Sequence, residues 1–267
     1  MSIDPKPRSR GIYLLPNLLT TLALFAGFYA IVAAIDGNFS SAGIAVFVAM
    51  VMDGLDGRVA RMTATQSDFG KEYDSLSDMV SFGLAPAVVV YQWGVARLLE
   101  YSVAWGRIGW LVAFLFAVTA ALRLARFNSA PSGVGKNWFQ GLPSPSAAAL
   151  VAAFVWLSAE YAIGGFSGLV LAFAVTAVAG ALMVSNFRYY SFKSINLGSK
   201  VSFAYLLLVP LIIALISINP PLVLFLLFLT YASSGPLLWL SGRTPHRLAV
   251  LDDDDDEDAE QPAERHD

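Results

Sequence analysis

Apolar stretches long enough to cross a lipid bilayer recur along most of the chain, and no other feature of the sequence constrains the fold as strongly. A hydrocarbon core of ~30 Å needs about 20 residues of α-helix, and a helix satisfies its own backbone hydrogen bonds in lipid. The sequence therefore predicts an all-α fold, a polytopic integral membrane helix bundle with about eight transmembrane helices. The stretches cover residues 12–35, 42–62, 74–99, 108–127, 145–162, 166–186, 201–218 and 222–240.

Lysine and arginine residues gather on alternate flanks of these stretches. Cytoplasmic flanks of membrane proteins carry an excess of basic residues. One side holds only Arg97 and Arg107, so we expect the other side, and with it both termini, to be cytoplasmic. The basic residues of that side are Lys6, Arg8, Arg10, Arg61, Lys71, Arg123, Arg126, Lys136, Arg188, Lys193, Lys200, Arg243 and Arg247.

The two ends of the chain differ from its apolar body. The first apolar stretch follows a basic segment, as in a signal peptide, but it is longer than usual and is interrupted by Pro16 and Asn17. We therefore expect it to be retained as a helix. The run LDDDDDEDAE near the C-terminus is too charged to pack. These patterns predict a transmembrane domain over residues 1–242 and a disordered, cytoplasmic acidic tail over residues 243–267.

Four aspartates, Asp53, Asp56, Asp74 and Asp78, lie in or against the apolar stretches. An aspartate at the bilayer centre costs roughly 3 kcal/mol, so its presence indicates a functional site. On helices, Asp53 and Asp56 share one stripe, and Asp74 and Asp78 share another. The polar segment TATQSD between them predicts a turn that lets the stripes face each other. Asp53 lies ~12 Å deeper than Arg61, which indicates a pocket in the cytoplasmic leaflet, open to the cytosol.

The ligands available to such a pocket are oxygens. The chain has no cysteine, and its histidines, His246 and His266, lie outside the apolar stretches. Converging carboxylates suit hard ions such as Mg²⁺ or Mn²⁺, and two such ions are a common device for displacement at phosphorus. The residues thus favour a metal-assisted phosphoryl-type transfer on a lipid. A cation transporter and an intramembrane prenyltransferase are the alternatives from other classes.

The spacing of these residues resembles the signature of the CDP-alcohol phosphatidyltransferases. It reads Asp53-x2-Asp56-Gly57-x2-Ala60-Arg61-x8-Gly70-x3-Asp74-x3-Asp78, with eight fixed positions over 26 residues. The resemblance implies a homodimeric membrane enzyme that transfers a phosphatidyl group from CDP-diacylglycerol to an alcohol and releases CMP. The domain over residues 1–242 would then be the catalytic one.

The same resemblance implies roles for individual residues. Asp53, Asp56 and Asp74 would hold two divalent cations, Mg²⁺ or Mn²⁺. Asp78 would bind one of them and also act as the base on the acceptor hydroxyl. The CDP-lipid would be bound by residues of the signature, by Ser67 in the spacer between its two halves, and by residues of the first helix. Besides Ser67 these are Gly57, Arg61, Gly70, Asn17 and Thr20.

Four further segments resemble the phosphatidylserine synthase branch of that family, which implies L-serine as the acceptor. Arg123 and Arg126 are candidates to bind the serine carboxylate, and glycerol 3-phosphate or an inositol compound are the alternative acceptors. We expect an integral protein of the bacterial cytoplasmic membrane with no nucleic-acid partner. The last two apolar stretches add nothing distinctive. The four segments are LPNLLTTLALFAGFYAI, ALRLARFN, FQGLPSPSAAA and SNFRYYSFK.

Overall fold

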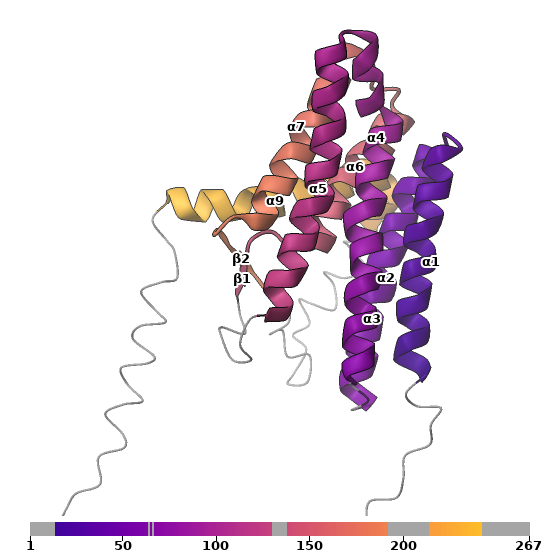
Figure 1. Ribbon diagram of the computed structural model, residues 1–267, viewed down its shortest axis with the longest axis vertical. Coiled ribbons are helices and arrows are strands. Elements are labelled where there is room, and N and C mark those ends of the chain that lie inside the picture. Colours follow the sequence, from indigo (N-terminus) through magenta and orange to yellow (C-terminus); the bar gives the residue numbers. More distant parts are fainter. Residues whose placement is uncertain (1–13, 64, 66, 130–137, 192–213, 242–267) are drawn as a thin grey trace, which may run out of the picture.

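The structure is a computed structural model that describes residues 14–63, 65, 67–129, 138–191 and 214–241, and these are mostly helical (Figure 1). The predicted all-α character is confirmed, apart from one short pair of strands. The helices are α1 (Leu14–Ile35), α2 (Phe39–Thr63), α3 (Asp68–Asp78), the π-helix η2 (Met79–Leu84), α4 (Ala85–Trp93), the 3₁₀-helix η3 (Val95–Glu100), α5 (Val103–Ser129), α6 (Ser144–Glu160), α7 (Gly165–Val184) and α9 (Pro220–Leu240). The strands are β1 (Trp138–Gln140) and β2 (Arg188–Tyr190).

Five helices in the described part of the chain are long and apolar enough to cross a membrane: α1, α2, α5, α7 and α9. They correspond to five of the predicted stretches. The predicted stretch 145–162 is α6, which is apolar but only 17 residues long. Most of 201–218, and the whole tail over residues 243–267, lie outside the described residues. The total of eight spans and the cytoplasmic termini therefore stay predictions.

The predicted stretch 74–99 has a different form from a single α-helix. The chain runs without a break through α3, η2 and α4, so that a π-helical segment separates two α-helices. The Ser77 hydroxyl donates to the Thr20 carbonyl (3.2 Å), and the Ser81 hydroxyl donates to the Ala23 carbonyl (3.1 Å). Gly27 permits this approach, because an added Cβ there would lie 2.5 Å from Ser81 Oγ. The π-helical segment is thus bound closely to α1.

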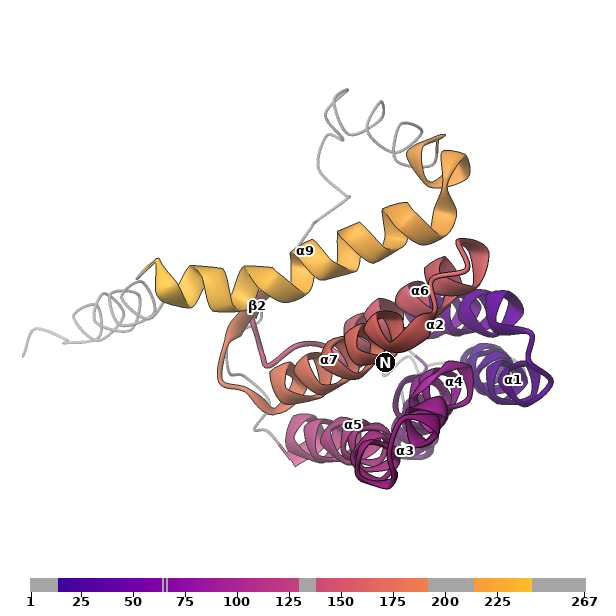
Figure 2. The same cartoon turned by 90° about the horizontal axis from the view of Figure 1, so that it is seen from above.

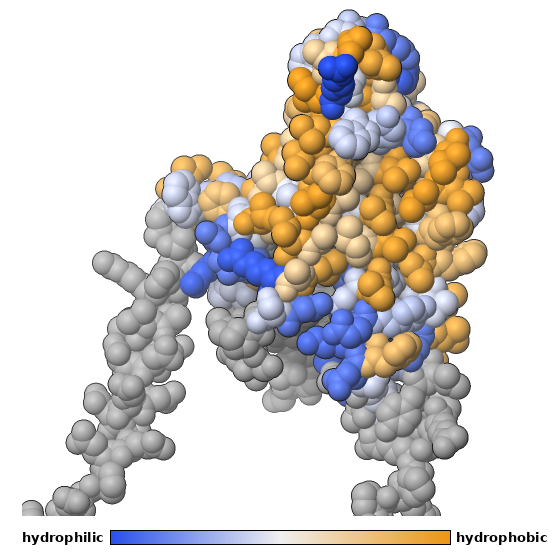
Figure 3. Space-filling model, viewed as in Figure 1, coloured by the Kyte–Doolittle hydropathy of each residue, from blue (hydrophilic) through white to orange (hydrophobic). Residues whose placement is uncertain are grey.

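The helices pack in layers around α6. Seen from above, α6 and α7 lie between α9 on one side and α4 and α5 on the other (Figure 2). Small buried side chains such as Ala147 and Ala152 allow the close approach of α6 to its neighbours. α9 crosses the bundle at a large angle to α1, α2 and α5 (Figure 1). The face seen in Figure 3 is largely apolar around its middle and carries hydrophilic residues toward the lower ends of α3 and α5 and also at its top.

A two-stranded antiparallel sheet lies beside the lower ends of α5 and α7 (Figure 1). Phe139 of β1 pairs with Tyr189 of β2. The turn from β1 toward α6 passes through Gly141, whose φ of +77° favours glycine and where a Cβ would collide with the Met183 carbonyl. Three-residue strands this far apart in sequence carry no readable pattern, so the sequence did not predict them. Their effect is to hold the segments after α5 and α7 together.

Candidate active site

Three carboxylates from two helices meet at one point. Asp53 and Asp56 on α2 and Asp74 on α3 each offer an oxygen, and these oxygens all lie within 4.8 Å of one another. Asp56 is buried, and the other two side chains are half-buried. The predicted convergence of the two aspartate stripes is thereby confirmed. Three close carboxylate oxygens form a group that could hold a metal ion.

Asp78 lies beside this cluster, one helical turn beyond Asp74. Its carboxyl group makes a hydrogen bond with Asp53 and interacts with the charges of Asp74 and Asp56. Carboxylates this close repel one another unless a proton or a cation lies between them. The donor set consists of carboxylate oxygens, which fits Mg²⁺ or Mn²⁺.

Helix α1 contributes two polar side chains to the site. Thr20 Oγ1 donates a 2.8 Å hydrogen bond to Asp56 Oδ2 and also lies 3.1 Å from the Pro16 carbonyl oxygen. Asn17 Oδ1 lies beside Gly70, where an added Cβ would be 3.4 Å away. Both residues were predicted to face the CDP-lipid; the structure places Thr20 against Asp56 and Asn17 beside Gly70, and the binding of the lipid stays a prediction. The Thr20 hydroxyl, however, binds a carboxylate that could hold a metal, a contact the sequence analysis did not foresee.

The end of the site where α2 stops and α3 begins is lined by Gly57, Arg61, Ser67 and Gly70. The Arg61 guanidinium lies over Gly57, whose missing side chain leaves that space open: a Cβ would be 3.5 Å from Nη1. Ser67 is the N-cap of α3, because its hydroxyl accepts a 3.0 Å hydrogen bond from the Gly70 amide. Arg61 and Ser67 are exposed. This end of the site can therefore receive a polar ligand.

The two candidate arginines have different surroundings. Arg123 is half-buried, donates from Nη1 to Ser144 Oγ at 2.8 Å and interacts with the charge of Asp78. Its Nε is buried and has no hydrogen-bond partner among the described residues. Arg126 is exposed and donates to Asn186 Oδ1 at 3.2 Å. Arg123 thus lies toward the carboxylates, whereas the hydrogen-bond partner of the exposed Arg126 is Asn186.

Three of the four segments singled out in the sequence meet here, although they are far apart along the chain. The bond between Arg123 and Ser144 joins the segment ALRLARFN to the segment FQGLPSPSAAA. Asn186, in SNFRYYSFK, accepts one hydrogen bond from each of these two segments, from Arg126 and from Gln140. Asn128 Nδ2 donates to Ser75 Oγ at 2.8 Å, which links α5 to α3 beside Asp74. The segments therefore form one side of the aspartate site.

Comparison with known proteins agrees with this geometry. The family model described as CDP-alcohol phosphatidyltransferase matches residues 13–186, a range that includes all four aspartates. The chain belongs to the CDP-alcohol phosphatidyltransferase family. Its members are enzymes, and the resemblance drawn from the aspartate spacing is confirmed.

Curated relatives of this phosphatidyltransferase carry names that include serine. The chain is 38% identical over 231 residues to the CDP-diacylglycerol--serine O-phosphatidyltransferase of Helicobacter pylori. This alignment covers 86% of the chain and 92% of the relative. The chain is 32% identical over 247 residues to the protein of that name from Mycobacterium tuberculosis, with 89% of the chain and 83% of the relative covered. The chain is 40% identical over 177 residues to the archaetidylserine synthase of Methanothermobacter thermautotrophicus, with 66% of the chain and 69% of the relative covered.

Several residues beside the phosphatidyltransferase site were missed by sequence reasoning. Ser144 and Asn128 lie inside the quoted segments but were not singled out. Tyr231 on α9 lies in the neighbourhood of Arg123, and its hydroxyl donates to the Tyr190 carbonyl of β2. The signal was present, since Tyr231 sits in the run LTYASSG, a polar interruption of an otherwise apolar stretch.

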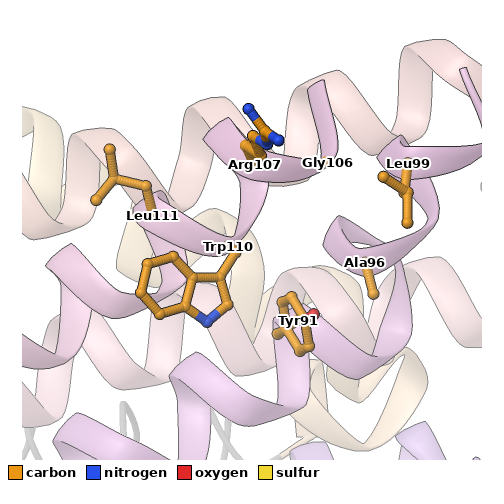
Figure 4. Close-up of a pocket in the computed structure, with 7 residues that line it drawn as sticks. All are labelled: Tyr91, Ala96, Leu99, Gly106, Arg107, Trp110 and Leu111. Atoms are coloured by element: carbon orange, nitrogen blue, oxygen red, sulfur yellow. The ribbon is translucent and has the colours of Figure 1, made fainter. Parts of the chain in front are cut away.

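A separate pocket lies at the other end of the molecule. It is lined by apolar and aromatic side chains of α4, η3 and α5, among them Tyr91 and Trp110, with Arg107 beside them (Figure 4). These elements meet at the top of Figure 1, whereas α3 lies low in the same view. The pocket therefore does not belong to the aspartate site of the phosphatidyltransferase.

Proposed function

We propose that this protein transfers a phosphatidyl group from CDP-diacylglycerol to the hydroxyl of L-serine, giving phosphatidylserine and CMP. The observation that carries the proposal is the 38% identity over 86% of the chain to a relative named for that reaction. The archaetidylserine relative supports serine as well, because its name keeps the serine while naming a different lipid.

In the proposed reaction the serine oxygen forms a bond to the lipid-bearing β-phosphorus, and the bond from that phosphorus to the CMP oxygen breaks. Asp78 accepts the proton of the serine hydroxyl, in keeping with its place beside the three clustered carboxylates. Asp53, Asp56 and Asp74 would hold two divalent cations, and Asp78 would be a further ligand of one. When bound, these ions neutralise the diphosphate and the charge that develops on the phosphoryl oxygens.

The CDP-lipid is held at the junction of α2 and α3. The Arg61 guanidinium offers a planar fork to phosphate oxygens. Gly57 and Gly70 leave room for the ligand against the backbone, and Ser67 and Asn17 border the same space. We assign Thr20 a different role from the one expected, since its hydroxyl orients Asp56.

The serine carboxylate is bound by Arg123. A half-buried guanidinium with its Nε unpartnered among the described residues offers the stronger site for a small anion. Arg126 is exposed and hydrogen-bonded to Asn186, so it is screened by solvent. Attraction of the carboxylate to Arg123 would place the serine hydroxyl near Asp78.

The location of the enzyme follows from the same lines of support. The basic flanks favour an active site that faces the cytoplasm, and bacterial relatives favour the cytoplasmic membrane. We propose a catalytic domain over residues 1–242, a tail over 243–267, and a homodimer as implied by the family. Chemical cross-linking in membranes tests the homodimer.

The deciding experiment is an acceptor panel. Purified protein is given CDP-diacylglycerol and Mg²⁺ or Mn²⁺ with L-serine, glycerol 3-phosphate or inositol, and released CMP and lipid product are measured. L-Serine should give phosphatidylserine and CMP, and the other two should give little. CMP release with glycerol 3-phosphate or inositol but not with L-serine would assign a different acceptor. The proposal would be contradicted if none of the three alcohols led to CMP release.

A further inference from the structure

A hydrogen bond joins α5, the helix that carries Arg123, to α3, which carries two of the aspartates. Asn128, near the end of α5, donates from Nδ2 to Ser75 Oγ of α3 at 2.8 Å, and both side chains are half-buried. Ser75 directly follows Asp74 and lies three residues before Asp78. Side chains three residues apart are neighbours on one face of a helix. The bond therefore reaches α3 beside the candidate catalytic base.

A second contact gives the register between the two segments. Eight residues along each of them from this hydrogen bond, Gly83 of η2 faces Ala120 of α5, because a Cβ on Gly83 would lie 3.3 Å from the Ala120 Cβ. The segments are therefore antiparallel and in step. Between the two contacts lie Asp78, about 4.5 Å along the axis from the hydrogen bond, and Arg123, about 7.5 Å along it. The base and the arginine thus lie at nearly the same level of the bundle.

Helix α3 is also held from its other side, by α1. The hydroxyl oxygens of Tyr73 and Thr21 are 2.9 Å apart, within hydrogen-bond distance. Helix α1 packs in turn against α2, which carries the other two aspartates. The bonds to α1 therefore support the side of α3 that belongs to the carboxylate cluster. The Asn128 bond supports the opposite side, where Arg123 lies.

We propose that Asn128 is a positioning residue for acceptor recognition, which acts through its bond to Ser75. The bond fixes the spacing between Arg123 on α5 and Asp78 on α3, so that one serine molecule reaches both. Serine carries its carboxylate and its hydroxyl on adjacent carbons, and a misplacement on the order of 1 Å can cost about 100-fold in rate. Neither Asn128 nor Ser75 is among the eight fixed positions of the signature. This inference rests on the proposed function.

The test measures CMP release by purified full-length Asn128→Ala, Ser75→Ala and the double variant, with L-serine and CDP-diacylglycerol varied in turn. Each single variant should raise the KM for serine about fivefold, the scale of one hydrogen bond. The double variant should be no worse than either single one, because both substitutions remove the same bond. The KM for CDP-diacylglycerol, and the Mg²⁺ concentration for half-maximal CMP release, should change by less than about twofold, because α1 and α2 support those groups.

Ser129→Ala is the matched control, because the Ser129 hydroxyl bonds to carbonyl oxygens of its own helix, those of Ala125 and Arg126. It should keep the wild-type KM for serine. Thermal unfolding in detergent is measured on every variant, and a loss of stability alone, with a wild-type KM for serine, would overturn the inference. An effect of Asn128→Ala that Ser75→Ala lacks, or full additivity, would overturn it as well, while leaving serine as the acceptor. A wild-type enzyme that ignores serine would overturn the proposed function itself.

Discussion

The hydroxyl of Thr20 and the carboxylate of Asp56 are joined by a 2.8 Å hydrogen bond between α1 and α2, and both side chains are only 4% exposed. Thr20 thereby orients one of the oxygens that could hold a metal. Groups that orient metal ligands commonly affect metal affinity by 10- to 100-fold, roughly, when they are removed. Helix α1 thus contributes a side chain that orients a candidate metal ligand, in addition to packing against α2.

Thr20→Val keeps the shape of the side chain and removes this hydrogen bond. We expect the concentration of Mg²⁺ or Mn²⁺ that gives half-maximal CMP release to rise about tenfold. Thr21→Val is the matched control, because Thr21 is exposed and bonds to Tyr73 instead. An equal shift in both variants would mean that α1 acts only through stability.

Replacing Asp78 by Asn should lower kcat by a factor of about 10² or more, the usual loss for a positioned base. Binding of CDP-diacylglycerol should be retained better than in Asp53→Asn, since Asp53 belongs to the three-carboxylate cluster. Steady-state rates and lipid binding are measured on the same preparations. Near-normal turnover in Asp78→Asn would place the base elsewhere.

Removing divalent cations should stop the reaction. Excess chelator is expected to abolish CMP release, and added Mg²⁺ or Mn²⁺ to restore it, because clustered carboxylates need a counter-charge to hold a diphosphate. Zinc should restore little, since nitrogen and sulfur ligands are missing from the cluster. Full activity in chelator would contradict the metal-assisted mechanism.

The two arginines should differ in their effect on serine. Arg123→Lys keeps the charge and loses the fork, so the KM for serine should rise about tenfold or more, while the KM for CDP-diacylglycerol changes little. Arg126 lies on the same helix but is exposed, so Arg126→Lys should leave both KM values, for serine and for CDP-diacylglycerol, close to wild type. The reverse order would move the carboxylate site to Arg126.

The contact of Gly27 with Ser81 predicts a steric effect on stability. Gly27→Ala places a Cβ 2.5 Å from Ser81 Oγ and should destabilise the fold by about 1–3 kcal/mol. Gly54→Ala has nothing within 4 Å of the new Cβ and should be neutral or slightly stabilising in a helix. Thermal unfolding in detergent compares them, and removing the Ser81 side chain as well should not restore stability, because the new Cβ would still lie 2.7 Å from the Ser81 Cα.

The aspartate site could be predicted from sequence because its geometry is helical and local. Asp53 and Asp56, and Asp74 and Asp78, are spaced by three and four residues, so each pair shares a face whatever the rest of the fold does. Ser67 shows a limit of such reasoning. It was expected to bind substrate, and its hydroxyl is engaged as the N-cap of α3. A serine at that position can serve either purpose.

The other side of the site could not be predicted in the same way. Arg123 meets Ser144, and Tyr231 meets β2, only through tertiary packing, and no spacing rule relates residues on these elements. A tyrosine inside an apolar stretch is equally typical of a lipid-facing position. The three-residue strands are too short for alternation to be visible. Here the resemblance of whole segments was the better guide, since those segments converge in the structure.

The π-helical segment after Asp78 has a consequence for chain length. Each carbonyl in a π-helix bonds to the amide five residues on, so η2 accommodates about one more residue than an α-helix of equal rise. Because a π-helix turns less per residue than an α-helix, the segment absorbs the surplus residue, and the buried face of α4 keeps nearly the phase that a continuous α-helix would give it. The surplus residue instead widens the backbone locally, where the Ser81 hydroxyl donates to the Ala23 carbonyl of α1. Deleting one residue between Met79 and Leu84 would therefore make the helix regular and disturb the contact of Ser81 with α1, while Val89 and Trp93 of α4 stayed buried. The sequence MVSFGL carries no visible motif, yet its length determines how α3 and α4 are joined beside the aspartates.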